Sequence, residues 1–190
     1  MKDIRAYIEE TVDIGEDDWR FFASKLIKRT FNKKEIILDI KKVEPYLSFI
    51  ESGIVRLLIP HEAPEKELTF GFCFTNEYVS AYDSFLTQTP STYQLQALTN
   101  TVMWSITHKD LQEVYNKTKI GNVVGRLSSE RLFILKSKRE LSLLTETAEE
   151  RYLNLFKERP QLIQKIPLKY IASYIGVTAQ ALSRIRKRIS

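Results

Sequence analysis

The chain has 190 residues, of which 43% are hydrophobic and 28% charged, the composition of an ordinary globular protein. No apolar run approaches the ~20 residues that cross a bilayer, and Met1–Glu10 lacks the apolar core of a signal peptide, so we expect a cytoplasmic protein without membrane contact. The single cysteine, Cys73, excludes an internal disulfide. With only two histidines, His61 and His108, no cluster exists for zinc or an iron–sulfur centre, and we expect neither a metal nor a cofactor.

Positive charge is concentrated at the C-terminal end. Residues 159–190 hold seven basic side chains and no acidic one, which leaves the first 158 residues with a net charge of −2 within the total of +5. An acidic body with a basic end favours a module that binds a polyanion. A solvated basic face is the alternative that charge alone leaves open.

Two predicted helices open the chain, and many short strands follow. Residues 2–10 and 16–28 carry apolar side chains at helical spacing. Between residues 31 and 107, short runs rich in β-branched and aromatic residues alternate with turn material. The predicted strands are Glu35–Leu38, Tyr46–Glu51, Ile54–Ile59, Leu68–Phe72, Gln94–Leu98 and Val102–Ile106. Many short strands without long helices between them predict a barrel or a sandwich.

The longest helical pattern covers residues 119–144, after a short predicted helix at 108–116. Its seam follows a 4-3 alternation through Ile120, Val124, Leu127, Arg131, Ile134, Lys138 and Leu141. A second apolar flank consists of Val123, Leu132, Phe133 and Leu135. A helix with two apolar flanks needs two surfaces to cover it, and these are its own β domain and the same helix of a second subunit. The core helix of a monomer is the alternative, with which Arg131 and Lys138 on the seam are consistent.

A capping box begins the next helix. Thr147 supplies a hydroxyl and Glu150, three residues on, supplies a carboxylate that reaches back. This helix is predicted to continue to about residue 158 and to be ended by Pro160. We therefore divide the chain into residues 1–118, a β domain with flanking helices, 119–145, a long helix expected to dimerise, and 146–190, a basic helical domain.

Residues 166–185 have the pattern of a helix-turn-helix. Pro167 suits the first turn of a helix, and Ala172 is small where two helices must cross. Gly176, four residues later, is predicted to adopt a positive φ, and Thr178 to cap the second helix. The predicted inner-face residues are Leu168, Ile171, Ala172, Leu182 and Ile185. A generic helical hairpin is the alternative.

The outward side of the second predicted helix carries no acid. Arginine pairs bidentately with guanine, glutamine pairs with adenine, and the remaining basic and hydroxyl side chains suit phosphates. A solubilising face would normally mix acids with bases. The expected DNA-contacting residues are Lys169, Thr178, Ala179, Gln180, Ser183, Arg184, Arg186, Lys187 and Arg188.

The whole chain resembles the Crp–Fnr superfamily of transcription regulators. Phe49–Arg56 resembles the family's β-roll signature, in which a glycine turn joins two strands, and Phe72–Ala97 occupies the place of its phosphate-binding cassette. Residues 119–144 match its dimer helix and 166–188 its helix-turn-helix. The resemblance implies an α+β fold with an N-terminal cyclic-nucleotide-binding-type β-roll (a jelly-roll), a long dimerisation helix and a C-terminal helix-turn-helix domain. The dimer-helix residues would be Ile120, Val124, Leu127, Ile134 and Leu141.

The same resemblance implies how DNA is read. A homodimer places one recognition helix per subunit in adjacent major grooves, ~34–36 Å apart, on a near-palindromic site. Arg184 stands at the family's base-reading arginine. Ala179 and Gln180 stand where two further polar base contacts are common, so the site read by this chain should differ.

The resemblance does not extend to the ligand of cyclic-nucleotide-binding relatives. Their Gly-Glu pair falls on Ser80-Ala81 and their Arg-Ser pair on Ser91-Thr92, so only the hydroxyl at Thr92 survives. A cyclic phosphate buried without a cation is strongly unfavourable, and we expect cyclic-nucleotide binding to be lost. A pocket for an unidentified small-molecule effector would use Tyr82, Asp83, Thr92, Tyr93 and Gln96. A degenerate pocket filled by its own side chains is the alternative.

Redox sensing and enzymatic catalysis are not expected. Cys73 sits between Phe72 and Phe74, the setting of a buried inert thiol, and His61 and His108 are expected at the surface rather than on haem. The chain has no Gly-rich phosphate loop, nucleophile elbow or metal-binding histidine pair, so we expect no enzyme. The predicted function is sequence-specific, homodimeric transcription regulation, with double-stranded DNA and RNA polymerase as partners. The alternative is a sensor or scaffold of the same fold that does not read DNA.

Overall fold

The computed structural model describes residues 2–189. By its internal contacts the chain divides into two compact units. The first contains the chain up to Ile59 together with Gly71–Ser129, and the second contains Pro60–Phe70 together with the chain from Glu130 on. No helix within residues 2–189 is long and apolar enough to cross a membrane.

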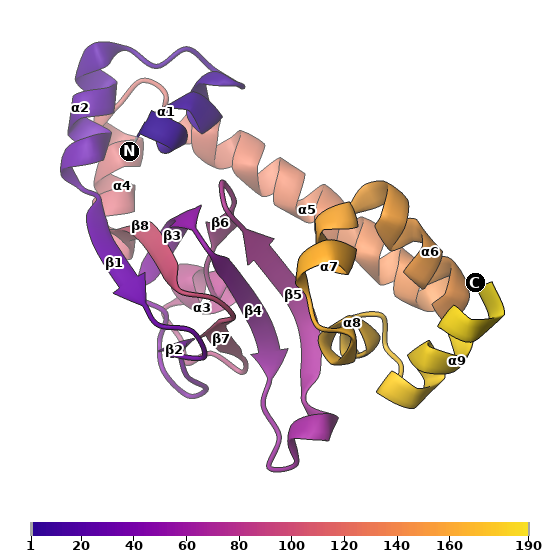
Figure 1. The fold of residues 1–190 in the computed structure, drawn as a ribbon. Helices are drawn as coiled ribbons and strands as arrows, with labels where there is room; N and C mark the ends of the chain where they lie inside the picture. The colour runs from indigo at the N-terminus through magenta and orange to yellow at the C-terminus, as the bar shows by residue number, and fades with distance from the viewer. Residues whose placement is uncertain (1, 190) are drawn as a thin grey trace. The chain divides into compact units, whose positions relative to one another are not determined.

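Two four-stranded sheets form the β-roll (Figure 1). Their strand orders are β1-β8-β3-β6 and β2-β7-β4-β5. The strands are β1 (Ile27–Phe31), β2 (Ile36–Leu38), β3 (Tyr46–Ser52), β4 (Ile54–Ile59), β5 (Leu68–Phe74), β6 (Tyr78–Val79), β7 (Gln94–Ala97) and β8 (Thr101–Thr107). The helices that precede, interrupt and follow the roll are α1 (Lys2–Glu9), α2 (Glu16–Ser24), the 3-10 turn η1 (Pro64–Lys66), α3 (Tyr82–Thr87) and α4 (His108–Lys117).

The turn between β3 and β4 requires glycine. Gly53 has a φ of +114°, and a Cβ placed on it would lie 2.5 Å from the hydroxyl oxygen of Thr101. Only a residue without a side chain fits there. Strand β3 then pairs on both edges, since Phe49 lies opposite both Trp104 on β8 and Tyr78 on β6. The glycine turn that joins β3 to β4 is as predicted.

The predicted helix at 16–28 is too long. Helix α2 ends at Ser24, and β1 begins at Ile27 because its backbone pairs with β8, with Ile27 opposite Ser105. The overlap of β1 with the predicted helix is too short for periodicity to distinguish a strand from the last turn of a helix, so the pattern did not reveal this strand. The short elements β6, α3 and α7 (Pro160–Lys165) were likewise not predicted.

Helices make up the part of the second unit that begins at Glu130. They are the C-terminal part of α5 (Gly121–Thr145), α6 (Ala148–Glu158), α7, α8 (Leu168–Tyr174) and α9 (Ala179–Ile189). The capping box is present, since Thr147 Oγ1 accepts from the Glu150 N–H at 3.3 Å and a Glu150 carboxylate oxygen accepts from the Thr147 N–H at 2.8 Å. Pro160 follows α6 and is also the first residue of α7. The first backbone N–H groups of a helix have no partner within the helix, so the missing N–H of proline costs no hydrogen bond there. The α+β class, with a β-roll followed by C-terminal helices, is confirmed.

Candidate nucleic-acid interface

A tight turn joins α8 to α9. Gly176 has a φ of +80°, as predicted, and follows the end of α8. The Val177 N–H donates to the Ala172 carbonyl at 3.0 Å, and the Gly176 N–H donates to the Ser173 carbonyl at 3.1 Å. These two bonds form a Schellman motif, which satisfies carbonyls that the end of a helix leaves unpaired. The turn therefore has a defined backbone geometry.

Helix α9 is anchored by two buried side chains. Leu182 and Ile185 are 1% and 8% exposed, and Ala172 on α8 is 1% exposed, so the small residue lies at the crossing as expected. Leu168 was expected on the same inner face, but it is 42% exposed. Pro167 precedes α8 rather than lying in its first turn, and its carbonyl accepts from the Tyr170 N–H at 2.9 Å. The buried face of α8 consequently begins at Ile171.

The opposite face of α9 is exposed. Gln180, Arg184 and Lys187 follow one another at i, i+4 and i+7, and Ser183 lies beside them. Within residues 2–189 no carboxylate pairs with Arg184 or Lys187. Both cations are available to an external anion.

The remaining predicted contacts surround this face. Thr178 Oγ1 accepts from the Ala181 N–H at 3.2 Å and so caps α9, which begins at Ala179. Arg186 is exposed on the same helix. Lys169 lies on α8, where it is exposed and its Nζ is 4.8 Å from the centre of the Tyr170 ring. The structure thus places the predicted residues Ala179–Arg188 on one helix, α9, and the predicted Lys169 on the preceding helix, α8.

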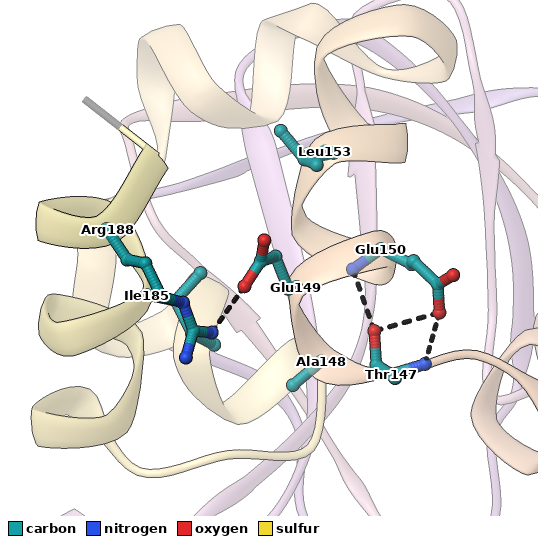
Figure 2. A pocket seen from close by; sticks show the side chains of 7 residues that line it. All are labelled: Thr147, Ala148, Glu149, Glu150, Leu153, Ile185 and Arg188. Atoms are coloured by element: carbon teal, nitrogen blue, oxygen red, sulfur yellow. Dashed lines mark hydrogen bonds and ion pairs between the residues drawn. The ribbon is translucent and has the colours of Figure 1, made fainter.

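Arg188 forms an ion pair with a carboxylate of another helix. Its guanidinium donates to a carboxylate oxygen of Glu149, in the first turn of α6 (Figure 2). The pair crosses an open groove of about 480 Å³ whose apolar lining consists of Ala148, Leu153 and Ile185. The sequence shows no acid between residues 159 and 190, and Glu149 was missed because it comes from another helix. A phosphate would have to compete with this carboxylate for Arg188.

The predicted seam of α5 falls into two parts. Ile120 and Val124 pack against the apolar cluster of the first unit, which contains Ile4, Ile8, Ile14 and Phe49. Leu127 is half-buried, whereas Ile134 and Leu141 are 55% and 57% exposed. Further exposed apolar side chains of the C-terminal part of α5 are Phe133, Leu135, Leu143 and Leu144. The uncovered apolar surface therefore lies in the C-terminal half of the helix.

A buried carboxylate binds the start of the cassette helix α3. Glu44, only 3% exposed, accepts from the Ala81 N–H at 3.3 Å and from the Tyr46 N–H at 3.0 Å. Burial raises the pKa of Glu44, and the positive charge of Arg29 opposes this rise. The sequence does not mark this contact, because Glu44 and Ala81 lie 37 positions apart.

The positions where relatives bind a cyclic nucleotide are engaged by the chain itself. The Ser80 hydroxyl donates to the Tyr46 carbonyl at 2.9 Å. Ser91, at the place of the family's arginine, donates its hydroxyl to the Tyr93 carbonyl at 2.8 Å. Neither of these hydroxyl groups supplies a cation for a phosphate.

The predicted effector residues are only partly brought together. The Tyr93 hydroxyl donates to an Asp83 carboxylate oxygen at 2.6 Å, and burial raises the pKa of Tyr93. The Tyr82 ring stacks on Phe85 with centroids 6.2 Å apart. Thr92 is exposed, and Gln96 lies on the side of β7 opposite to the buried Leu95 and Ala97. Asp83 and Tyr93 satisfy each other, and Gln96 faces away from the core side of the strand.

Comparisons with known proteins agree with this architecture. Residues 28–118 match the family model of the cyclic nucleotide-binding domain. No curated protein matches the chain in sequence. Among solved structures, the chain resembles the c-di-GMP-responsive global regulator CLP of Xanthomonas campestris, with a TM-score of 0.69, 16% identity, and 92% of this chain and 91% of that chain covered.

Two further structures have the same fold. The catabolite activator protein of Thermus thermophilus gives a TM-score of 0.57 and 17% identity, with 96% of this chain and 86% of that chain covered. A protein of Eubacterium rectale assigned to the Crp/Fnr family of transcriptional regulators gives a TM-score of 0.69 and 15% identity, with 93% and 84% covered. These neighbours are transcription regulators and not enzymes.

Proposed function

Because residues 28–118 match the cyclic nucleotide-binding domain and the chain has the fold of Crp–Fnr transcription regulators, we propose that the protein reads DNA as a homodimer. In this proposal α8 and α9 form a helix-turn-helix. The observation that carries it is the exposed face of α9, on which Gln180, Arg184 and Lys187 meet no carboxylate of residues 2–189. The buried Leu182 and Ile185 hold the opposite face in place.

The side chains of α9 suit distinct parts of a DNA duplex. With α9 in the major groove, the guanidinium of Arg184 can donate two hydrogen bonds to one guanine, and Gln180 can pair with an adenine. Ser183, Lys187 and Arg186 lie beside them and suit phosphates, which orient the protein without reading sequence. Lys169 adds a cation from α8. The function is therefore sequence-specific regulation of transcription, and an activator of this kind would also contact RNA polymerase.

The homodimer is supported by the apolar surface of α5. Ile134, Leu141 and Leu144 are 55%, 57% and 76% exposed in one chain, and Ile134 and Leu141 are spaced seven residues apart on one side of the helix. Pairing with the same helix of a second copy covers such a stripe. In this arrangement residues 119–145 act as the dimerisation helix and residues 146–190 as the reading domain.

Cyclic-nucleotide binding is, in this proposal, lost. Glu44 places a buried carboxylate on the N–H of Ala81, and Ser91 stands where a cation would be needed. The relative CLP responds to c-di-GMP, so this ligand belongs in any test beside the cyclic mononucleotides. Titration with cAMP, cGMP and c-di-GMP should give no binding heat for the two mononucleotides, and saturable binding of either would contradict the loss.

Selection of bound sequences from randomised duplex DNA tests the reading function. At near-physiological salt the protein should enrich a two-fold-symmetric motif, and Arg184→Ala should lose it while keeping its fold. Lys157→Ala, which removes an exposed cation on α6, is the matched control and should retain the motif. Sequence preference retained by Arg184→Ala would contradict the role of Arg184. Weak binding without any motif would favour the sensor or scaffold without DNA reading.

A further inference from the structure

The last carbonyl groups of α8 are bound by two arginines from other helices. The carbonyls of Tyr174 and Ile175 directly precede Gly176, the turn residue before α9. Arg139, on α5, donates a hydrogen bond to the Tyr174 carbonyl. Arg151, on α6, donates to the Ile175 carbonyl at 2.8 Å. The end of α8 is thus tied to α5 and α6.

Arg139 is held by its surroundings in one orientation. Its guanidinium carbon lies 3.7 Å from the centre of the Tyr174 ring, so the same residue supplies a carbonyl and an aromatic face. Stacking on a ring and donation to a carbonyl both use the planar guanidinium, which lysine cannot reproduce. Burial lowers the pKa of Arg139, as do the positive charges of Arg159 and Arg151.

Arg151 joins the C-terminal ends of two helices. Besides Ile175, it donates to the carbonyl of Glu146 and, at 3.5 Å, to the carbonyl of Ser142, both at the end of α5. Helix C-termini carry partial negative charge and unpaired carbonyls, and a cation there is favourable. A Cβ built on Gly176 would lie 3.9 Å from Arg151 and 3.8 Å from the Leu143 side chain, so the turn itself lies against α5 and α6.

We propose that Arg139 and Arg151 are positioning residues that fix the direction of α9 relative to α5 and thereby set the spacing of the DNA half-sites that a dimer accepts. This inference rests on the proposed function. In the dimer the two α5 helices pair, so a rotation between α5 and the α8–α9 turn occurs in both subunits, and its component across the two-fold axis moves the two copies of α9 in opposite directions. Ser173 adds a third tie, since its hydroxyl donates to the Glu67 carbonyl and accepts from the Thr69 N–H, both at 2.8 Å.

Helix α9 is long enough for a small rotation at the turn to change the half-site spacing. Helix α9 has 11 residues, which corresponds to ~16 Å at ~1.5 Å per residue. A rotation of ~10° at the turn moves the middle of α9 by ~1.4 Å, and opposite movements in the two subunits change the separation of the two helices by ~3 Å, close to the ~3.4 Å rise of one base pair per strand. Two arginines that limit such rotation therefore decide between neighbouring spacings.

The experiment separates spacing from sequence. Duplexes carry the selected half-sites at the preferred separation or with one or two base pairs added or removed, and affinities are measured for wild type, Arg139→Met and Arg151→Met. We expect the ratio of affinities between the preferred and neighbouring spacings to fall on the order of tenfold in either variant. Both should still select the wild-type sequence in an isolated half-site. Lys157→Met is the matched control and should keep the wild-type ratio.

The spacing ratios test the roles of Arg139 and Arg151 separately from the proposed function. Spacing ratios equal to wild type in folded Met variants would overturn the inference, and so would loss of half-site sequence together with spacing. If the Met variants do not fold, as judged by circular dichroism, Arg139→Lys and Arg151→Lys are tested in their place, because lysine keeps the charge without the planar guanidinium. An unchanged spacing ratio in the Lys variants overturns the inference, and a reduced ratio supports it. Failure of the wild type to select any two-fold motif would instead refute the proposed function.

Discussion

Removal of two apolar side chains from α5 should separate the proposed dimer. Ile134 and Leu141 lie one heptad apart in the C-terminal half of α5, which belongs to the second unit. The double variant Ile134→Ala/Leu141→Ala shortens both side chains without introducing charge. Alanine has the highest helix propensity, so the helix itself should persist.

The magnitude follows from exposure in the single chain. The two side chains are 55% and 57% exposed. Complete burial of an isoleucine or leucine contributes ~1.5–3 kcal/mol, so covering the exposed half contributes about 1 kcal/mol for each side chain. Two side chains in each of two subunits give about 4 kcal/mol, which corresponds to about a thousandfold weaker dimer at 1.4 kcal/mol per factor of ten.

Sedimentation equilibrium over a wide concentration range measures this change directly. Leu86→Ala is the matched control, because Leu86 is a 52% exposed leucine on α3 rather than α5. The control should leave the dissociation constant of the dimer unchanged. A double variant that dimerises as tightly as wild type would refute the assignment of these residues to the interface, and a monomeric wild type would refute the dimer.

Three further perturbations test other contacts. Glu149→Gln should release Arg188, raise DNA affinity and steepen the slope of log affinity against log salt by about 0.9. Adding Arg188→Gln should abolish this gain in DNA affinity. An unchanged slope would contradict the competition between Glu149 and phosphate for Arg188. Gly176→Ala should lower the free energy of unfolding by about 1 kcal/mol and the melting temperature by ~2–4 °C, because its φ is +80°, whereas Gly176→Asn should lose less; equal losses would argue against left-handed strain. The free energy of unfolding of Glu44→Gln should rise relative to that of wild type as pH increases from 4.5 through the pKa of Glu44 in the folded protein. Burial raises the pKa of Glu44, so the folded protein binds this proton more tightly than the unfolded chain, and wild type loses stability over this pH range. Urea titrations across pH measure this difference, and a difference independent of pH would contradict it.

Features that depend on neighbouring residues followed from the sequence alone. The capping box at Thr147, the positive φ of Gly176 and the exposed side of α9 were all predicted, because each depends on residues within one or two helical turns. Most strands of the roll were found from short β-rich runs bounded by turns. The basic, acid-free stretch after residue 159 was visible as composition.

Only the tertiary structure decided which groups meet across the chain. The pairs Glu149–Arg188, Glu44–Ala81 and Arg139–Tyr174 join residues 39, 37 and 35 positions apart, and no local pattern marks them. The first two residues of β1, Ile27 and Lys28, were predicted as helix for the same reason, since the partner strand β8 lies far along the chain. Periodicity and capping are fixed by backbone geometry over a few residues, whereas the partner of a buried carboxylate or guanidinium is fixed by how complete helices and sheets pack.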